Sequence, residues 1–162
     1  MYENTYPSKR FEHTLAFLRK HVTGEETILD LGVENPFSKI MEEQGYSVEN
    51  TKGEDLDVDF TSVQNSSAEV ATAFEIFEHL LAPFNVLREI KTNKLVASIP
   101  LKLWFSPAYQ SKTDIWDRHY HEFEDWQFDW LRRKKPNSKH QIPKKFRSLP
   151  VLQQTDSCQN GH

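Results

Sequence analysis

Apolar and polar residues alternate along this chain with two different periods, and this pattern predicts a protein of the α/β class. In residues 8–22 the apolar side chains of Phe11, Leu15, Leu18 and Val22 recur at steps of four, three and four, as on one face of an amphipathic helix. Short apolar runs are typical of buried parallel strands. Such runs occur at residues 27–31, 70–74 and 95–100, and Tyr46-Ser47-Val48-Glu49-Asn50 is expected to form a further strand.

Helix-start and helix-stop residues lie between these runs. Asn35 is a good N-cap, and Pro36 suits the first helical position, so we expect a helix from Pro36 to Gln44 that ends at Gly45. A second helix is expected from Pro83 through residue 90. Strands that alternate with helices predict a mostly parallel sheet with helices on its faces, in a three-layer sandwich.

Two segments between residues 50 and 70 are less regular. Residues 53–60 alternate acidic and apolar side chains, which predicts a short half-exposed strand; a solvated acidic edge is the alternative. Residues 62–67 are polar, and we expect a loop there.

Aromatic side chains concentrate late in the chain. Residues 104–130 hold 9 of the 20 aromatics, which would not remain unpacked in water. We expect this segment to cover the carboxyl edge of the sheet as a lid. Its last part predicts a helix over residues 124–133 that buries Phe128 and Leu131.

The charge is unevenly distributed, although the formal net charge is only −4. Residues 132–162 contain eight Lys and Arg against one acidic residue. An arm that binds nucleic acid or a membrane is one interpretation of such a tail. A disordered tail is the interpretation we favour, because Phe146 is its one aromatic residue. We therefore expect one folded domain at residues 1–131 and a basic, disordered tail at residues 132–162.

The remaining composition points to the cytoplasm. Cys158 is the single cysteine, so an internal disulfide is excluded and a reducing compartment is expected. We see no secretory signal pattern and no apolar run near the roughly 20 residues that span a bilayer. We therefore expect a cytoplasmic protein without membrane association.

Several short motifs, taken together and in order, resemble those of the class I S-adenosylmethionine-dependent methyltransferases. Ile28-Leu29-Asp30-Leu31-Gly32 is similar to the start of that family's first motif, and Ala73-Phe74-Glu75-Ile76-Phe77-Glu78-His79-Leu80 is similar to its fourth-strand motif. Ala97-Ser98-Ile99-Pro100 resembles the fifth strand and its turn, and His121-Glu122-Phe123 resembles the segment before a later helix. The resemblance covers about residues 8–131.

The resemblance implies a Rossmann-like fold and methyl transfer from S-adenosylmethionine, which leaves S-adenosylhomocysteine. It implies that Asp30 and Gly32 lie at the amino-acid end of this cofactor and that Phe74 and Glu75 border the reacting methyl group. A further carboxylate usually holds the ribose in the family. We favour Asp55 and Asp57 for that role, and Glu49 and Glu54 are alternatives. The expected acceptor is a small molecule.

Two groups of histidines are candidates for other chemistry. His79 and His121 are the candidate catalytic bases for deprotonating the acceptor, although His79 is more often a capping or packing residue in such a position. His119-Tyr120-His121-Glu122 has the residue types of a metal site, but no further ligand cluster accompanies it. We expect no metal and place these residues in the acceptor pocket.

The chain also departs from the family pattern. Only the first glycine of the usual glycine loop is present, and Glu34 adds a negative charge where the cofactor carboxylate is expected. Residues 132–136 interrupt the pattern that leads to the last two strands, so we expect a sheet truncated at its C-terminal edge. An exposed edge of this kind favours a homodimer.

These departures leave two alternatives to a methyltransferase with a small-molecule acceptor. The first is a catalytically inactive methyltransferase-like protein with a binding or structural role. The second is a nucleic-acid-associated methyltransferase that uses the basic tail. We disfavour nucleic acid as a partner because the Asn-Pro-Pro-Tyr type of motif is absent.

Overall fold

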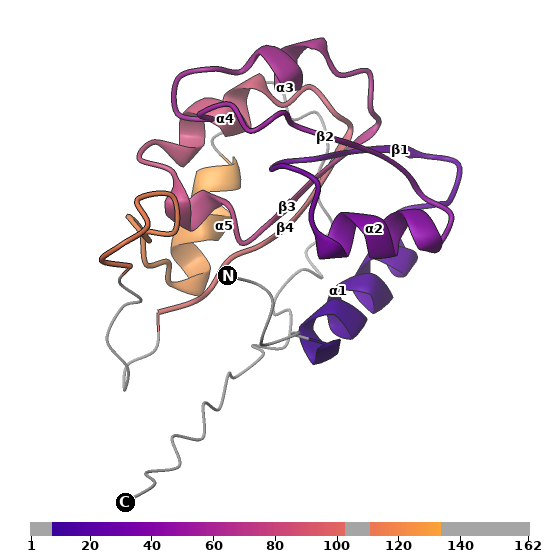
Figure 1. Cartoon of the computed structure of the whole chain (residues 1–162), viewed down its shortest axis with the longest axis horizontal. Helices are drawn as coiled ribbons and strands as arrows, with labels where there is room; N and C mark the ends of the chain where they lie inside the picture. Colours follow the sequence, from indigo (N-terminus) through magenta and orange to yellow (C-terminus); the bar gives the residue numbers. More distant parts are fainter. Residues whose placement is uncertain (1–7, 103–110, 134–162) are drawn as a thin grey trace, which may run out of the picture.

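The computed structural model of the chain describes residues 8–102 and 111–133 (Figure 1). Its strands are β1 (Thr27–Asp30), β2 (Ser47–Asn50), β3 (Val70–Phe74) and β4 (Lys94–Ser98). Its helices are α1 (Ser8–His21), α2 (Pro36–Glu43), α3 (Thr61–Asn65), α4 (Pro83–Glu89) and α5 (Asp125–Arg133), with a 3₁₀ turn η1 (Phe77–His79). Residues 104–110 of the predicted lid and residues 134–162 of the predicted tail lie outside the described residues.

The four strands form one parallel sheet in the order β2-β1-β3-β4, which confirms the predicted α/β class. Asp30, the last residue of β1, pairs with Asn50 on one side and with Thr72 on the other. The chain therefore steps from β1 outward to β2, then returns to the opposite side of β1 for β3 and β4. Between β1 and β3 the direction of winding reverses, and ligands bind open α/β sheets at such a point.

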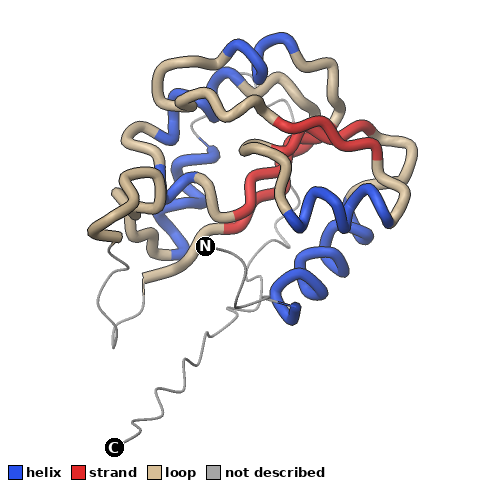
Figure 2. The backbone as a smooth tube through the Cα atoms, in the orientation of Figure 1, coloured by secondary structure: helices blue, strands red, loops and turns tan. Residues whose placement is uncertain are grey.

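Alternate residues of β1 contact different helices, as the period of a strand requires. Ile28 packs in one buried cluster with Leu18 of α1 and Met41 of α2. Leu29 packs in a second cluster with Leu87 of α4. In Figures 1 and 2, α1 and α2 lie on one side of the strands, and α3 and α4 lie on the other.

The start and end of α2 follow the predicted signals. The Asn35 side chain accepts hydrogen bonds from the amides of Phe37 (2.9 Å) and Ser38 (3.0 Å), and the Ser38 hydroxyl accepts one from the Asn35 amide (2.8 Å). This reciprocal capping satisfies amide groups that the first helical turn leaves unpaired. After the helix, Gly45 takes a φ of 89°, a backbone conformation that suits glycine.

Two predictions between residues 50 and 70 are wrong. Residues 53–60 form turns rather than a strand: the Asp55 carboxylate accepts the Asp57 amide, and the Asp55 carbonyl accepts the Asp59 amide (2.8 Å). These local bonds compete with strand pairing. The predicted loop at residues 62–67 contains α3, which starts beside an Asp59 bond to the Thr61 amide and is anchored by the buried side chain of Val63.

The last described segment packs beside the end of the sheet. Leu101 forms an isolated parallel bridge with Phe123, and the Lys102 amide donates to the Phe123 carbonyl at 2.8 Å. Phe128 packs in the core against Phe77 and Phe123, as predicted, with ring centroids 5.6 and 5.7 Å apart. Other aromatic side chains of the predicted lid are exposed to solvent, namely Trp116, Tyr120, Trp126 and Trp130. In the described part of the chain, every helix is too short or too polar to cross a membrane.

Candidate functional site

A buried polar network joins the carboxyl ends of β1, β2 and β3. The Asp30 side chain, 2 % exposed, accepts hydrogen bonds from the Thr72 hydroxyl (2.5 Å) and from the Asn35 and Asn50 amide groups (3.2 Å each). Burial raises the pKa of this carboxyl, and the three hydrogen bonds oppose that increase. Asp30 therefore holds three segments of the chain together at the point where the winding reverses.

Gly32 forms the turn that follows β1. Its φ of 115° is a conformation that side chains other than glycine rarely adopt. Its amide donates to the Thr51 hydroxyl at 2.8 Å, and its carbonyl accepts the Asn50 side-chain amide at 3.2 Å. A Cβ atom at this position would lie 3.5 Å from Ile76, so the turn lies directly beside the chain that follows β3.

Glu34 in the same turn has a partner. Its carboxylate is 2.7 Å from the Lys39 ammonium group, and both side chains are largely exposed. The negative charge that the sequence predicted near a bound cofactor is therefore paired with a cation one helical turn away.

Glu75 follows β3 in a strained conformation. Its φ is 57°, and it is the one non-glycine residue with positive φ among the described residues. Its carboxylate accepts the Ser98 hydroxyl at 2.7 Å and lies 3.6 Å from the Arg10 guanidinium group. Strain of this kind in a residue at the carboxyl edge is a feature of functional sites. The preceding residue, Phe74, packs edge-on against Phe37 of α2 at 5.1 Å.

The two aspartates favoured for the ribose have backbone partners. Asp55 accepts the Asp57 amide at 3.0 Å, and Asp57 accepts the amides of Leu81 and Ala82 at 2.8 Å each. Asp57 thereby fixes the start of α4. The alternatives also have partners: Glu49 accepts the Ser66 hydroxyl, and Glu54 accepts the Lys52 amide at 2.7 Å. The assignment of a ribose carboxylate stays a prediction.

The two candidate catalytic histidines come from different parts of the chain: His79 is the last residue of η1, and His121 lies in the segment that precedes α5. The amides of Tyr120 and His121 donate to the Glu78 carbonyl, at 2.8 and 3.2 Å. His79 directs Nδ1 to the Arg118 carbonyl (3.1 Å), and His121 directs Nε2 to the Leu81 carbonyl (3.2 Å). A carbonyl only accepts, so these nitrogens carry the protons in the neutral rings. The other nitrogen of each neutral ring is the basic one.

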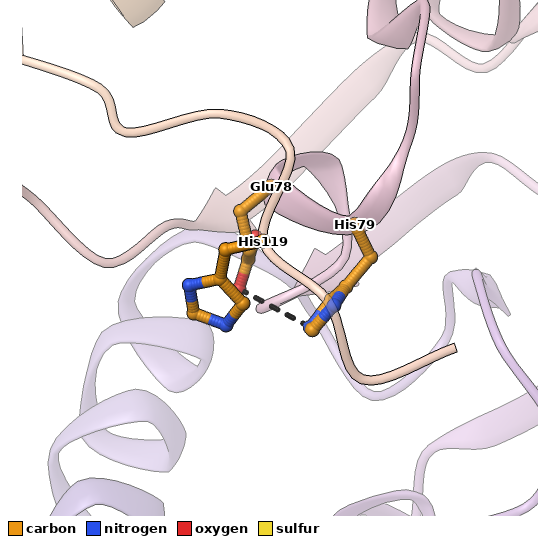
Figure 3. Close-up of side chains that lie close together, drawn as sticks. All are labelled: Glu78, His79 and His119. Carbon is orange, nitrogen blue, oxygen red and sulfur yellow. Dashed lines mark ion pairs between the residues drawn. The ribbon is translucent and has the colours of Figure 1, made fainter. Parts of the chain in front are cut away.

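Glu78 and His119 lie beside His79, a grouping that the sequence did not predict (Figure 3). The sequence associated His119 with His121 and Glu122 instead, and we expected no metal there. Glu78 is 0 % exposed, and burial together with the charge of Glu75 raises its pKa to about 8. The His119 ring meets the His79 ring edge-on at 4.7 Å, and burial lowers its pKa. The adjacency of Glu78 and His79 in the fourth-strand motif was the available signal, but the 40-residue separation from His119 concealed the group.

No protein-family model matches the chain, and a search of curated proteins found no match.

Proposed function

We propose that this chain is a class I S-adenosylmethionine-dependent methyltransferase that acts on a small-molecule acceptor. The proposal is carried by one observation: the Gly32 turn after β1 lies beside Ile76, which directly follows the strained Glu75 at the end of β3. That place is where the winding of the sheet reverses, and it is the position expected for a ligand. The motifs around Asp30 and Glu75 that resemble this family lie on its two sides.

The residues at this place fit such a cofactor. Gly32 lacks a side chain, so the backbone can come close to the amino-acid end of the molecule. Asp30 already accepts three hydrogen bonds, and an ionised carboxylate has about four acceptor positions, which leaves capacity for a donor such as an ammonium group. Phe74 and Glu75 are the residues that would border the methyl group.

S-adenosylmethionine supplies an electrophilic methyl group when it is bound. The chain's own contribution is to hold the acceptor in line with this group and, where the acceptor must lose a proton, to accept that proton. His79 Nε2 and His121 Nδ1 are the basic nitrogens for that step, because the opposite nitrogen of each ring faces a backbone carbonyl.

The proposed methyltransferase fold also implies a particular layer arrangement and a particular oligomeric state. We infer a Rossmann-like three-layer sandwich that lacks the last two family strands among the described residues, where β4 lies at an edge of the sheet. The predicted homodimer would form through such an exposed edge.

The test is calorimetric titration of the full chain with S-adenosylmethionine, S-adenosylhomocysteine, adenosine and methionine. We expect micromolar binding of the two complete molecules and much weaker binding of the two fragments, because each fragment makes only part of the contacts. Absence of heat and of thermal stabilisation at millimolar ligand, with protein shown to be folded by circular dichroism, would contradict the proposal. That result would favour the catalytically inactive, methyltransferase-like protein.

A further inference from the structure

Glu78 is a buried carboxyl group without a hydrogen-bond partner. Its side chain is 0 % exposed, and among the described residues neither of its two oxygens takes part in a hydrogen bond. A buried, unpaired carboxylate is strongly unfavourable, so such a group is expected to bind either a proton or a cation. His79 Nε2 is 3.8 Å from the nearer Glu78 oxygen, which is too long for a hydrogen bond.

The orientation of His79 favours a cation. Because Nδ1 donates to the Arg118 carbonyl, the neutral ring directs the lone pair of Nε2 toward the carboxylate of Glu78. A lone pair that faces a carboxylate is favourable only when something positive lies between them. A histidine that ligates a metal through one nitrogen generally donates its other N–H to a carbonyl or carboxylate, as His79 does here.

His119 completes a group of three. One ligand atom from each of Glu78, His79 and His119 can be chosen so that all three atoms lie within 4.8 Å of one another. Figure 3 shows the three side chains close together. His119 lies in the segment that precedes α5, and Glu78 and His79 lie on η1. The backbone bonds from Tyr120 and His121 to the Glu78 carbonyl hold this segment in place.

We propose that Glu78, His79 and His119 bind a divalent transition-metal ion, with Zn²⁺ as the preferred ion. Two imidazole nitrogens and one carboxylate oxygen are a ligand set that Zn²⁺ uses, at about 2.0–2.2 Å from each atom. Two ligand atoms on a tetrahedral ion lie roughly 3.3 Å apart by the same bond lengths. The 3.8 Å between Glu78 and His79 Nε2 therefore requires a small contraction, and ligand atoms separated by up to 4.8 Å require a larger one.

Three protein ligands leave a fourth position of the ion for water or substrate, which is the arrangement of a catalytic rather than a closed structural zinc site. Two charges act on Glu78 from nearby: the Glu75 carboxylate raises its pKa, and the Arg10 guanidinium group, which is paired with Glu75, lowers it. The metal site shares His79 Nε2 with the proposed methyl transfer, so a bound ion would leave His121 Nδ1 as the base for that reaction. The test of the metal site uses no S-adenosylmethionine, so its result is separate from that of the proposed function.

The experiment is equilibrium dialysis of the EDTA-treated full chain against Zn²⁺ at pH 7, followed by the visible spectrum of the Co²⁺-loaded protein. The C158S variant serves as the parent, so that the single thiol contributes no binding. We expect one tightly bound Zn²⁺ per chain, an increase in Tm when Zn²⁺ is added, and a Co²⁺ spectrum of a four- or five-coordinate site.

His119→Gln and His121→Gln form the matched pair, because both histidines lie on one segment and only His119 belongs to the group. We expect His119→Gln and Glu78→Gln to weaken Zn²⁺ binding by about 10- to 100-fold or more, and His121→Gln to leave it unchanged. Circular dichroism establishes that each variant is folded. Equal Zn²⁺ binding by all the variants, or no binding by the parent at 100 µM Zn²⁺ (roughly 5.5 kcal/mol of binding free energy), would overturn the proposal; the second result would indicate that Glu78 is neutralised by a proton.

Discussion

Ser98 bonds to Glu75 twice: its hydroxyl donates to the Glu75 carboxylate at 2.7 Å, and its carbonyl accepts the Glu75 amide at 3.0 Å. Ser98 is the last residue of β4, and Glu75 is the first residue after β3. These two bonds hold the backbone of Glu75 at a positive φ of 57°. The end of β4 thus holds Glu75, the residue that follows the neighbouring strand β3, in a strained conformation.

Glu75→Ala and Glu75→Gly separate the strain from the side chain. Both variants lose the bond to Ser98 and the ion pair with Arg10, but only alanine keeps a Cβ atom in the left-handed region. We expect Glu75→Ala to be less stable than Glu75→Gly by about 1 kcal/mol, from the cost of positive φ. Urea unfolding measures the difference. Equal stabilities would show that this conformation is not strained.

Gly32→Ala and Gly45→Ala test the position of the proposed cofactor. Both glycines have positive φ, at 115° and 89°, so each substitution is destabilising, by about 1 kcal/mol or more. Only Gly32 lies between β1 and β3; a Cβ at Gly45 would meet nothing within 4 Å. Titration calorimetry should give at least about tenfold weaker S-adenosylhomocysteine binding for Gly32→Ala, about 1.4 kcal/mol. A similar loss in Gly45→Ala would point to general destabilisation instead.

Asp57→Ala is expected to reduce stability more than Asp55→Ala. Asp57 satisfies two backbone amides, of Leu81 and Ala82, whereas Asp55 satisfies one in its own turn. Hydrogen bonds to a charged group contribute about 1.5–3 kcal/mol each at most, and partial exposure reduces this, so we expect a loss of about 1–2 kcal/mol for Asp57→Ala. Chemical denaturation checks the order. If Asp55→Ala weakens S-adenosylhomocysteine binding without loss of stability, the predicted ribose contact is supported.

The stability of the metal-free chain should fall as the pH rises from 6 to 8. The pKa of Glu78 is raised from 4.5 to about 8, so in this range the native chain retains a proton that the unfolded chain has released. The protonated Glu78 carboxyl gives its full contribution to the free energy of unfolding below the unfolded-state pKa of 4.5. This contribution is lost as the pH rises through the folded-state pKa of about 8, at up to about 1.4 kcal/mol per pH unit.

Thermal unfolding in EDTA buffers, with Glu78→Gln as control, measures this dependence. We expect a steeper decline of Tm with pH in the parent than in the variant, because glutamine cannot ionise. Parallel curves would contradict a raised pKa at Glu78.

The fold was largely accessible from the sequence because its signals are local. The buried runs around Ile28 and Val70 gave the strands, and Asn35, Pro36 and Gly45 gave the limits of α2 to within one residue. The errors arose where the local pattern was ambiguous. Acidic and apolar residues alternate in residues 53–60, yet the aspartates bond to nearby amides, and a single buried residue, Val63, anchors a helix made otherwise of polar residues.

The candidate site could be predicted only in part because it depends on separations that no local pattern contains. The resemblance drew attention to Asp30, Gly32 and Glu75, and the structure places these residues at the carboxyl ends of the neighbouring strands β1 and β3. The resemblance did not indicate that Asn50 and Thr72 complete the hydrogen-bond network of Asp30, or that His119 lies beside Glu78. Such pairings follow from strand order and from the course of the late segment.

The amides of residues 120 and 121 both donate hydrogen bonds to the Glu78 carbonyl. They therefore hold this segment against the same residue whose side chain is buried without a hydrogen-bond partner. An outward movement of this segment would break these bonds and move His119 away from Glu78. Hydrogen exchange at the Tyr120 amide would therefore report on how long the three-residue group stays assembled.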